Sequence, residues 1–222
     1  MRAEPSPTTA NAVPSPRVIV CVGFNHRDSQ RAMGAPDRAE PLLFLKPARS
    51  VAGPGAPIRC PDGVDALDVS AELAVVIGRP TRCVTPEQAV GHIEGFTCAN
   101  DVAVREWMRS EAQWFAAKGA DGFCPLGPRT VPLDDLDRRR ITLRINGEVR
   151  RSGTVGELIW SVPELVALAT RHVTLGPGDI ILTGSPAAPA TAHPGDHVEV
   201  TVDGIGTLIN PIVGTGREGP AS

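Results

Sequence analysis

Short apolar runs separated by turn residues dominate the pattern of hydrophobic and polar positions along the chain. Most runs are rich in β-branched side chains and are bounded by Gly, Pro, Asn or Asp, which is typical of strands. The pattern predicts strands at 17–23, 42–46, 71–78, 95–100, 141–145, 148–150, 178–184, 197–202 and 207–210. Helical spacing is confined to four segments, at 29–33, after Thr85, at 102–108 and at 162–171.

Two dipeptides predict tight turns between neighbouring strands. Asn146-Gly147 is a strong two-residue hairpin signal, and Asp203-Gly204 separates two further strands that we expect to pair. Predicted strands greatly outnumber predicted helices. The sequence shows no internal repeat and no linker within the expected domain. These features predict a single α+β domain that is rich in mixed and antiparallel sheet.

The two ends of the chain differ in composition from the middle. Residues 1–16 are rich in Pro, Ser, Thr and Ala and lack the apolar core of a signal peptide, so we expect a disordered leader. The domain is expected at 17–213, followed by a flexible tail at 214–222.

Composition excludes several classes of protein. With 222 residues, 41% of them hydrophobic, and a formal net charge of −3, the chain is not a basic nucleic-acid binder. No apolar run approaches the roughly 20 residues that a membrane span needs, so no membrane partner is expected. The five cysteines are odd in number and scattered, which favours free thiols in the cytoplasm.

Lysine is the scarcest charged residue. Only Lys46 and Lys118 occur among 22 basic residues, the others being Arg. A lysine in such a chain can mark a place where a compact, titratable ammonium is needed. Chance is an equally good explanation when the two lysines are considered without their neighbouring residues.

Two carboxylates lie beside expected buried strands. Glu72 interrupts the apolar strand 71–78, and Asp101 follows the strand 95–100. A buried acid is costly without a partner, so the two could converge on one cation. The alternative is that Glu72 pairs with an arginine while Asp101 caps the helix after it.

The chain resembles the fumarylacetoacetate hydrolase family from about Val18 to Val213. The motifs that carry the resemblance are 22–25 (VGFN), 43–47 (LFLKP), 71–78 (AELAVVIG), 99–102 (ANDV), 124–127 (CPLG), 145–148 (INGE), 177–184 (PGDIILTG) and 204–208 (GIGTL). The resemblance implies a mixed β-sandwich roll, a homodimer, and chemistry on small oxo acids or β-dicarbonyl compounds. It also implies a Mg²⁺ or Mn²⁺ ion held by three carboxylates, which stabilises an enolate.

The family's metal ligands transfer only in part. Glu72 and Asp101 match two of the three carboxylates, but Ser70 stands where the third is expected. Asp68 lies on the same face of the strand, too far away to replace that ligand unless the chain bends there. The metal site is therefore expected to be weak or absent, and a protein without any metal is one alternative.

The residues expected to act on the substrate are also partly changed. The resemblance implies catalytic roles for Lys118, Arg105, Glu72 and Asp101, and substrate contacts from Asn25, His26, Ser29, Lys46, Met108 and Ser185. The family's lid carries a His and a Glu that activate water, and here those positions are Ser29 and Ala32. Both lysines match family positions, which favours a role for Lys118 and a weaker, structural one for Lys46.

Three functions follow from this partial match. The first is a diverged enzyme that handles an enolisable oxo or β-dicarbonyl compound by enolate stabilisation, as an isomerase, cyclase or decarboxylase of a specialised pathway. The second is a metal-dependent acylpyruvate or oxo-acid hydrolase or decarboxylase. The third is a catalytically inert binding or scaffold subunit.

Overall fold

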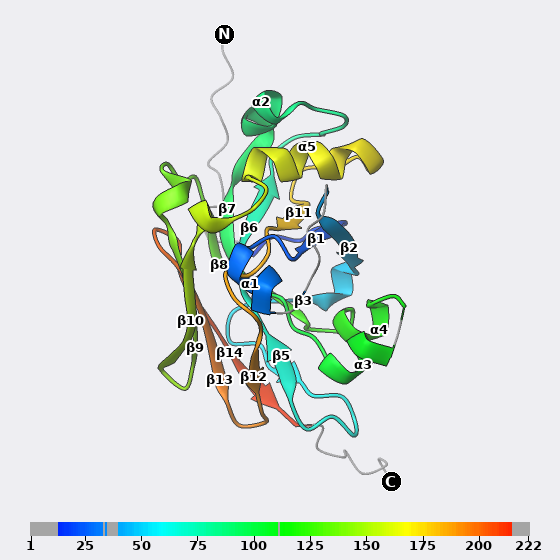
Figure 1. Ribbon diagram of the computed structural model, residues 1–222, viewed down its shortest axis with the longest axis vertical. Coiled ribbons are helices and arrows are strands. Elements are labelled where there is room, and N and C mark those ends of the chain that lie inside the picture. Colours follow the sequence, from blue (N-terminus) through cyan, green and yellow to red (C-terminus); the bar gives the residue numbers. More distant parts are fainter. Residues whose placement is uncertain (1–12, 33, 35–39, 111, 215–222) are drawn as a thin grey trace.

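A seven-stranded mixed sheet forms the centre of the molecule (Figure 1). The computed structural model describes residues 13–32, 34, 40–110 and 112–214. The sheet has the order β2-β1-β11-β6-β7-β8-β3. Its strands are β1 (Ile19–Gly23), β2 (Leu42–Lys46), β3 (Val51–Ala52), β6 (Ala71–Ile77), β7 (Ile93–Asn100), β8 (Cys124–Val131) and β11 (Ile180–Leu182).

Two further sheets complete the β-rich roll. A five-stranded sheet has the order β10-β9-β13-β14-β4, and β12 pairs with β5. These strands are β4 (Ile58–Arg59), β5 (Leu67–Val69), β9 (Arg140–Ile145), β10 (Glu148–Thr154), β12 (Ala190–Ala192), β13 (His197–Val202) and β14 (Gly206–Val213). Both expected hairpins are confirmed, since β9 pairs with β10 and β13 with β14, each antiparallel.

The helices lie at the ends and edges of the sheets (Figure 1). α5 packs its apolar face on the main core and contacts α2, whereas α3 and α4 lie together beside the central sheet. The α-helices are α1 (Arg27–Ala32), α2 (Pro86–Ala89), α3 (Arg105–Ser110), α4 (Phe115–Lys118) and α5 (Val162–His172), with short 3-10 turns at Ala48–Ser50, Val90–His92, Leu136–Arg138 and Val155–Glu157.

Strand β6 is buried on both faces. Leu73, Val75 and Ile77 lie in the main core, while Ala74 and Val76 belong to a second apolar cluster on the other face. The strand expected at 71–78 is confirmed, since β6 spans Ala71–Ile77. Glu72 shares the face of Ala74 and Val76, so an acid enters a setting from which water is largely excluded.

Tertiary contacts override two predictions. The helix expected from residue 102 begins at Arg105, because Ala103 pairs with Asp68 in an antiparallel bridge and keeps that segment extended. Lys118 is the last residue of α4, and its backbone N–H donates to the carbonyl of Trp114. The strand expected at 178–184 is shorter, spanning Ile180–Leu182.

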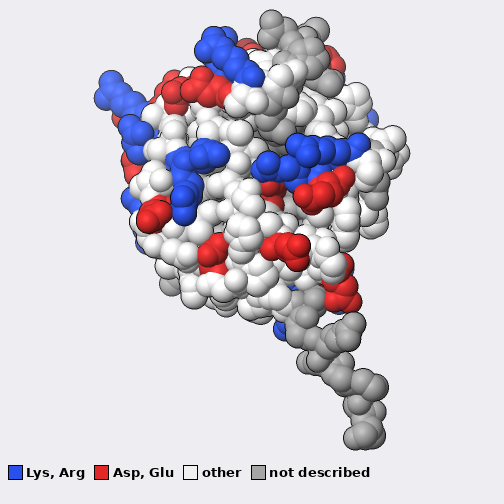
Figure 2. Space-filling view, turned by 60° about the horizontal axis from the view of Figure 1, so that its bottom comes forward, with Lys and Arg blue, Asp and Glu red and all other residues white. Residues whose placement is uncertain are grey.

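The ends of the chain lie mostly outside the described residues. This holds for 1–12 of the expected leader and 215–222 of the expected tail, while Val13 packs against the second apolar cluster. Among the described residues no helix combines the length and apolarity that crossing a membrane requires. Positive and negative side chains are interspersed on the face shown in Figure 2.

Candidate active site

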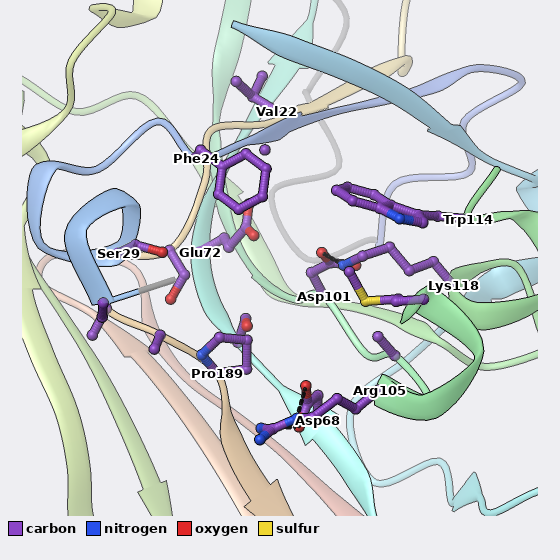
Figure 3. A pocket seen from close by; sticks show the side chains of 18 of the residues that line it. Val22, Phe24, Ser29, Asp68, Glu72, Asp101, Arg105, Trp114, Lys118 and Pro189 are labelled. Atoms are coloured by element: carbon purple, nitrogen blue, oxygen red, sulfur yellow. Dashed lines mark hydrogen bonds and ion pairs between the residues drawn. The ribbon is translucent and has the colours of Figure 1, made fainter. Parts of the chain in front are cut away.

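A cavity of about 610 Å³ opens between the β1–α1 turn, the start of β6, helices α3 and α4, and the segment after β11 (Figure 3). It gathers residues from segments far apart in the sequence. The lining consists of Val22, Gly23, Phe24, Ser29, Ala32, Phe44, Asp68, Ser70, Glu72, Asp101, Ala103, Arg105, Met108, Arg109, Trp114, Lys118, Arg151, Ser185, Ala187, Ala188 and Pro189.

The chain's two lysines meet at Asp101. Lys118 Nζ donates a hydrogen bond to Asp101 Oδ2, and Lys46 Nζ lies 2.8 Å from Asp101 Oδ1. Burial alone would raise the pKa of Asp101, but the two ammonium groups hold it below its ordinary value. Asp101 is therefore an ionised carboxylate, and it does not cap a helix.

Lys46 is a structural anchor. Its Nζ donates to the carbonyl oxygens of Val102 at 2.9 Å, Lys118 at 2.7 Å and Phe123 at 2.8 Å. Because an ammonium has only three N–H groups, its contact with Asp101 Oδ1 is ionic, and that oxygen accepts no hydrogen bond. The Lys46 side chain is fully buried and does not line the cavity.

Lys118 presents its charge to the cavity. Its Nζ lies 5.0 Å from the centre of the Phe44 ring and 5.9 Å from that of Trp114. Burial lowers the pKa of Lys118, but Asp101 more than offsets this and the pKa is raised. Within the described part of the chain its ammonium donates a hydrogen bond to Asp101 alone, which leaves N–H groups that can reach a substrate oxygen.

Glu72 enters the same cavity from β6. Its Oε2 accepts a 2.7 Å hydrogen bond from the backbone N–H of Gly184, whose φ of +96° belongs to the region that favours glycine. Burial, and then the charge of Asp101, raise the pKa of Glu72 to about 8. The side chain therefore pairs with a backbone amide and not with an arginine, and its carboxyl can both lose and gain a proton near neutral pH.

Glu72 is expected to make stability depend on pH. Its pKa rises from 4.5 in an exposed setting to about 8 in the fold, so its stabilising effect is complete below pH 4.5 and is lost as pH rises through about 8. Gln does not ionise, so Glu72→Gln should not lose stability as pH rises through about 8. Melting curves of wild type and Glu72→Gln should therefore diverge across this pH range, with only the wild type losing the extra stability.

The exposed acid Glu94 provides the control, because Glu94→Gln should follow the wild-type curve at every pH. Parallel curves for Glu72→Gln and wild type would show that Glu72 titrates at its ordinary pKa.

The chain bends at Ser70, between β5 and β6, which belong to different sheets. The bend brings Asp68 into the cavity lining, as the resemblance allowed. Arg105 Nε, however, donates to both carboxylate oxygens of Asp68, at 3.0 and 2.8 Å. Asp68 is thus held in an ion pair with Arg105. Arg105, a predicted site residue, lines the cavity together with Asp68.

These side chains do not fit the three-carboxylate ion site of the family. Each oxygen of Asp101 faces an ammonium, Asp68 is held by Arg105, and Ser70 offers only a neutral oxygen. A hard divalent cation depends on carboxylate charge for its affinity. The one carboxylate free of a cation partner among these is Glu72.

The remaining predicted substrate contacts divide into two groups. Ser29, Met108 and Ser185 line the cavity, as does Ala32 on the same helix as Ser29. Asn25 and His26 do not belong to the lining.

Asn25 and His26 instead contact the segment before α5. Asn25 Nδ2 donates to the carbonyl oxygens of Thr183 at 2.8 Å and Trp160 at 3.1 Å. The His26 ring is buried, which lowers its pKa, and its Nε2 lies 3.7 Å from Glu157. Asn25 therefore holds the β1–α1 turn in place, and neither residue reaches the cavity as predicted.

Several lining residues were missed by reasoning from the sequence, among them three aromatic residues and Arg109. Phe24, Phe44 and Trp114 form one end of the cavity, and Arg109 follows Met108 on α3. A signal for the rings was present, since the chain has only five Phe, three Trp and no Tyr. In a chain with so few aromatic residues, as with so few lysines, each one is a candidate site residue.

Comparison with known proteins identifies the family. The family model "Fumarylacetoacetate (FAA) hydrolase C-terminal" matches residues 18–213. The chain is 37% identical over 213 residues to the mitochondrial oxaloacetate tautomerase FAHD2A of Homo sapiens, covering 90% of this chain and 68% of that protein. It is 36% identical over 214 residues to the oxaloacetate tautomerase YisK of Bacillus subtilis, covering 90% and 71%.

A solved structure is similar over nearly the same span. The 5-carboxymethyl-2-hydroxymuconate delta-isomerase from Mycobacterium smegmatis has a TM-score of 0.85 and 39% identity, and the match covers 92% of this chain and 81% of that one. Members of the family commonly use a divalent metal. The protein belongs to the fumarylacetoacetate hydrolase family of enzymes.

Proposed function

We propose that this enzyme is a tautomerase or isomerase of a small enolisable oxo acid or β-dicarbonyl compound, and that the Lys118 ammonium takes over enolate stabilisation from a metal. The observation that carries the proposal is the Lys118–Asp101 pair beside Glu72 in one cavity (Figure 3). Asp101 fixes the ammonium, and Glu72 offers a carboxyl within the same enclosed space.

The chemistry needs two groups. Glu72 as a carboxylate takes a proton from the carbon next to the substrate carbonyl, which leaves an enolate whose charge lies on oxygen. Lys118 donates a hydrogen bond to that oxygen, and in a site shielded from water this stabilisation is larger than in solution. Glu72 then returns the proton to oxygen or to another carbon of the enolate, which completes the tautomerisation.

The relatives support the reaction class. Two of them are named oxaloacetate tautomerases and one solved neighbour is named an isomerase, and in each case the name describes a shift of a proton and a double bond. Hydrolysis would also need a general base to activate water. The resemblance places that base and its partner at Ser29 and Ala32, which cannot act as a base. Tautomerisation requires no attacking water, so it is the reaction that the remaining residues support best.

Ultraviolet absorbance of the enol tests the proposal. The wild type should speed the approach to keto–enol equilibrium of at least one among oxaloacetate, acetylpyruvate and acetylacetone above the spontaneous rate. Glu72→Gln should lower the acceleration by about 10²–10⁴-fold, the range for loss of a general acid or base. Glu94→Gln should retain it.

Absence of acceleration on all three compounds would contradict the proposal and favour the inert scaffold subunit. Equal acceleration by Glu72→Gln and the wild type would remove Glu72 from the mechanism.

The oligomeric state, compartment and ligand class follow from the family and from composition. We propose a homodimer on the family resemblance alone. All five cysteines are free, which supports a reducing compartment such as the cytoplasm. The net charge of −3 gives no support to a nucleic-acid partner, so a small molecule is the expected ligand.

A further inference from the structure

Three aromatic side chains form one end of the cavity. Trp114 contacts Phe24 with ring centres 6.2 Å apart and Phe44 with ring centres 5.3 Å apart, both in edge-to-face geometry. The rings come from the β1–α1 turn, from β2 and from the residue before α4. The chain has only five Phe and three Trp, so this cluster, called here the aromatic end, is a marked concentration.

The aromatic end is built rigidly. Phe24 adopts a φ of +59°, which a bulky side chain rarely takes. The next residue, Asn25, holds that turn by accepting a 2.8 Å hydrogen bond from the N–H of Trp160 and by donating to the carbonyls of Trp160 and Thr183. The turn that places the Phe24 ring in the lining is thus fixed from outside the cavity.

The rings lie directly beside the reacting group. Trp114 and Lys118 are one helical turn apart, and the ammonium lies over the rings of both Trp114 and Phe44. A substrate whose carbonyl oxygen meets Lys118 therefore places the neighbouring substituent against these rings.

One ion pair of the lining, between Arg105 and Asp68, lies away from the rings. Figure 3 shows the Arg105–Asp68 pair on the opposite side of Asp101 from Phe24 and Trp114. Arg109 comes from the same helix as Arg105, and Arg151 Nε is bonded to the carbonyl of Ala188 at 2.8 Å. A carboxylate against the three rings would lose its water and would not meet the Arg105 guanidinium, which Asp68 already holds.

We infer that the aromatic end is a subsite for a planar, unsaturated apolar substituent, such as an aryl group, attached to the carbonyl that Lys118 binds. This inference rests on the proposed function, because that function places the carbonyl. It narrows the substrate class from oxo acids in general to enolisable compounds with an aryl or conjugated group at that carbonyl. Flat groups fit edge-to-face and stacked contacts with fixed rings better than saturated ones do.

Titration calorimetry with three β-diketones tests the subsite. The probes are benzoylacetone, its cyclohexyl counterpart and acetylacetone, which present a flat ring, a puckered ring and a methyl group to the same site. We expect benzoylacetone to bind the wild type at least about 10-fold tighter than acetylacetone, with the cyclohexyl compound between them. Equal affinities for all three would overturn the inference, as would equal binding of the flat and puckered rings.

Variants locate the effect. Trp114→Ala should lose most of the preference for benzoylacetone, and Phe24→Leu should lose the preference for flat over puckered rings. Phe115→Ala is the matched control, because this neighbouring ring is 68% exposed and outside the lining, and it should keep the wild-type preference. A preference that survives both Trp114→Ala and Phe24→Leu would place the aryl group elsewhere.

Failure of the subsite and failure of the proposed function give different results. Tight binding of benzoylacetone by a protein that accelerates no tautomerisation would leave the subsite standing and refute the function. Acceleration of acetylacetone tautomerisation without any preference for benzoylacetone would support the function and refute the subsite.

Discussion

Replacing Lys118 with Met is expected to abolish most turnover while leaving the protein folded. Removal of a donor that stabilises a developing oxyanion typically costs about 10²–10³-fold in rate. The fold should tolerate the change, because Asp101 keeps Lys46 at 2.8 Å and is not left as an unpaired buried charge. Initial rates of tautomerisation and a melting curve on the same preparation measure both effects.

Lys46→Met is the matched control, since it removes the other ammonium on the same carboxylate. Three buried carbonyl oxygens would lose their donor, each at a cost of about 1–3 kcal/mol. For a domain of this size we expect the melting temperature to fall by about 10 °C or more. If Lys118→Met melts as low as Lys46→Met, or retains turnover, Lys118 is a structural cation and the assignment of its role is wrong.

Hydrolysis of acetylpyruvate is expected to be weak or absent. General base catalysis is typically worth about 10²–10⁴-fold, and the helix that lines the cavity carries Ser29 and Ala32 in place of a base and its partner. Pyruvate release, coupled to its enzymatic reduction, measures the rate. A rate equal to that of a hydrolytic member of the family, assayed in parallel, would contradict the prediction.

The double variant Ser29→His with Ala32→Glu provides the converse test. Both positions face the cavity from α1, so the new pair lies where water could be activated. We expect a measurable gain in hydrolysis relative to the wild type, with tautomerisation retained. No gain in a variant that melts like the wild type would show that more than the water-activating pair is missing.

Local pattern was sufficient to predict much of the fold. The strand β6 and the turn at Asn146-Gly147 depend on neighbouring residues, and both are present as expected. The match of both scarce lysines to family positions favoured a role for Lys118 and a weaker, structural one for Lys46, and both side chains meet at Asp101.

The features that were missed depend on contacts between distant segments. The bridge between Asp68 and Ala103 delays the start of α3, and no periodicity within that segment could reveal it. The ion pair of Asp68 with Arg105 likewise requires the bend at Ser70. The aromatic end joins three separate elements, so its residues could be listed from the sequence but not brought together.

The rate of tautomerisation before and after removal of divalent metals tests the central claim most directly. The claim is that the Lys118 ammonium, fixed by Asp101, stabilises the enolate in place of a metal. The account predicts that protein dialysed exhaustively against a chelator keeps its full initial rate and gains nothing when Mn²⁺ is added back. A rate that disappears on chelation and returns with stoichiometric Mn²⁺ would contradict it.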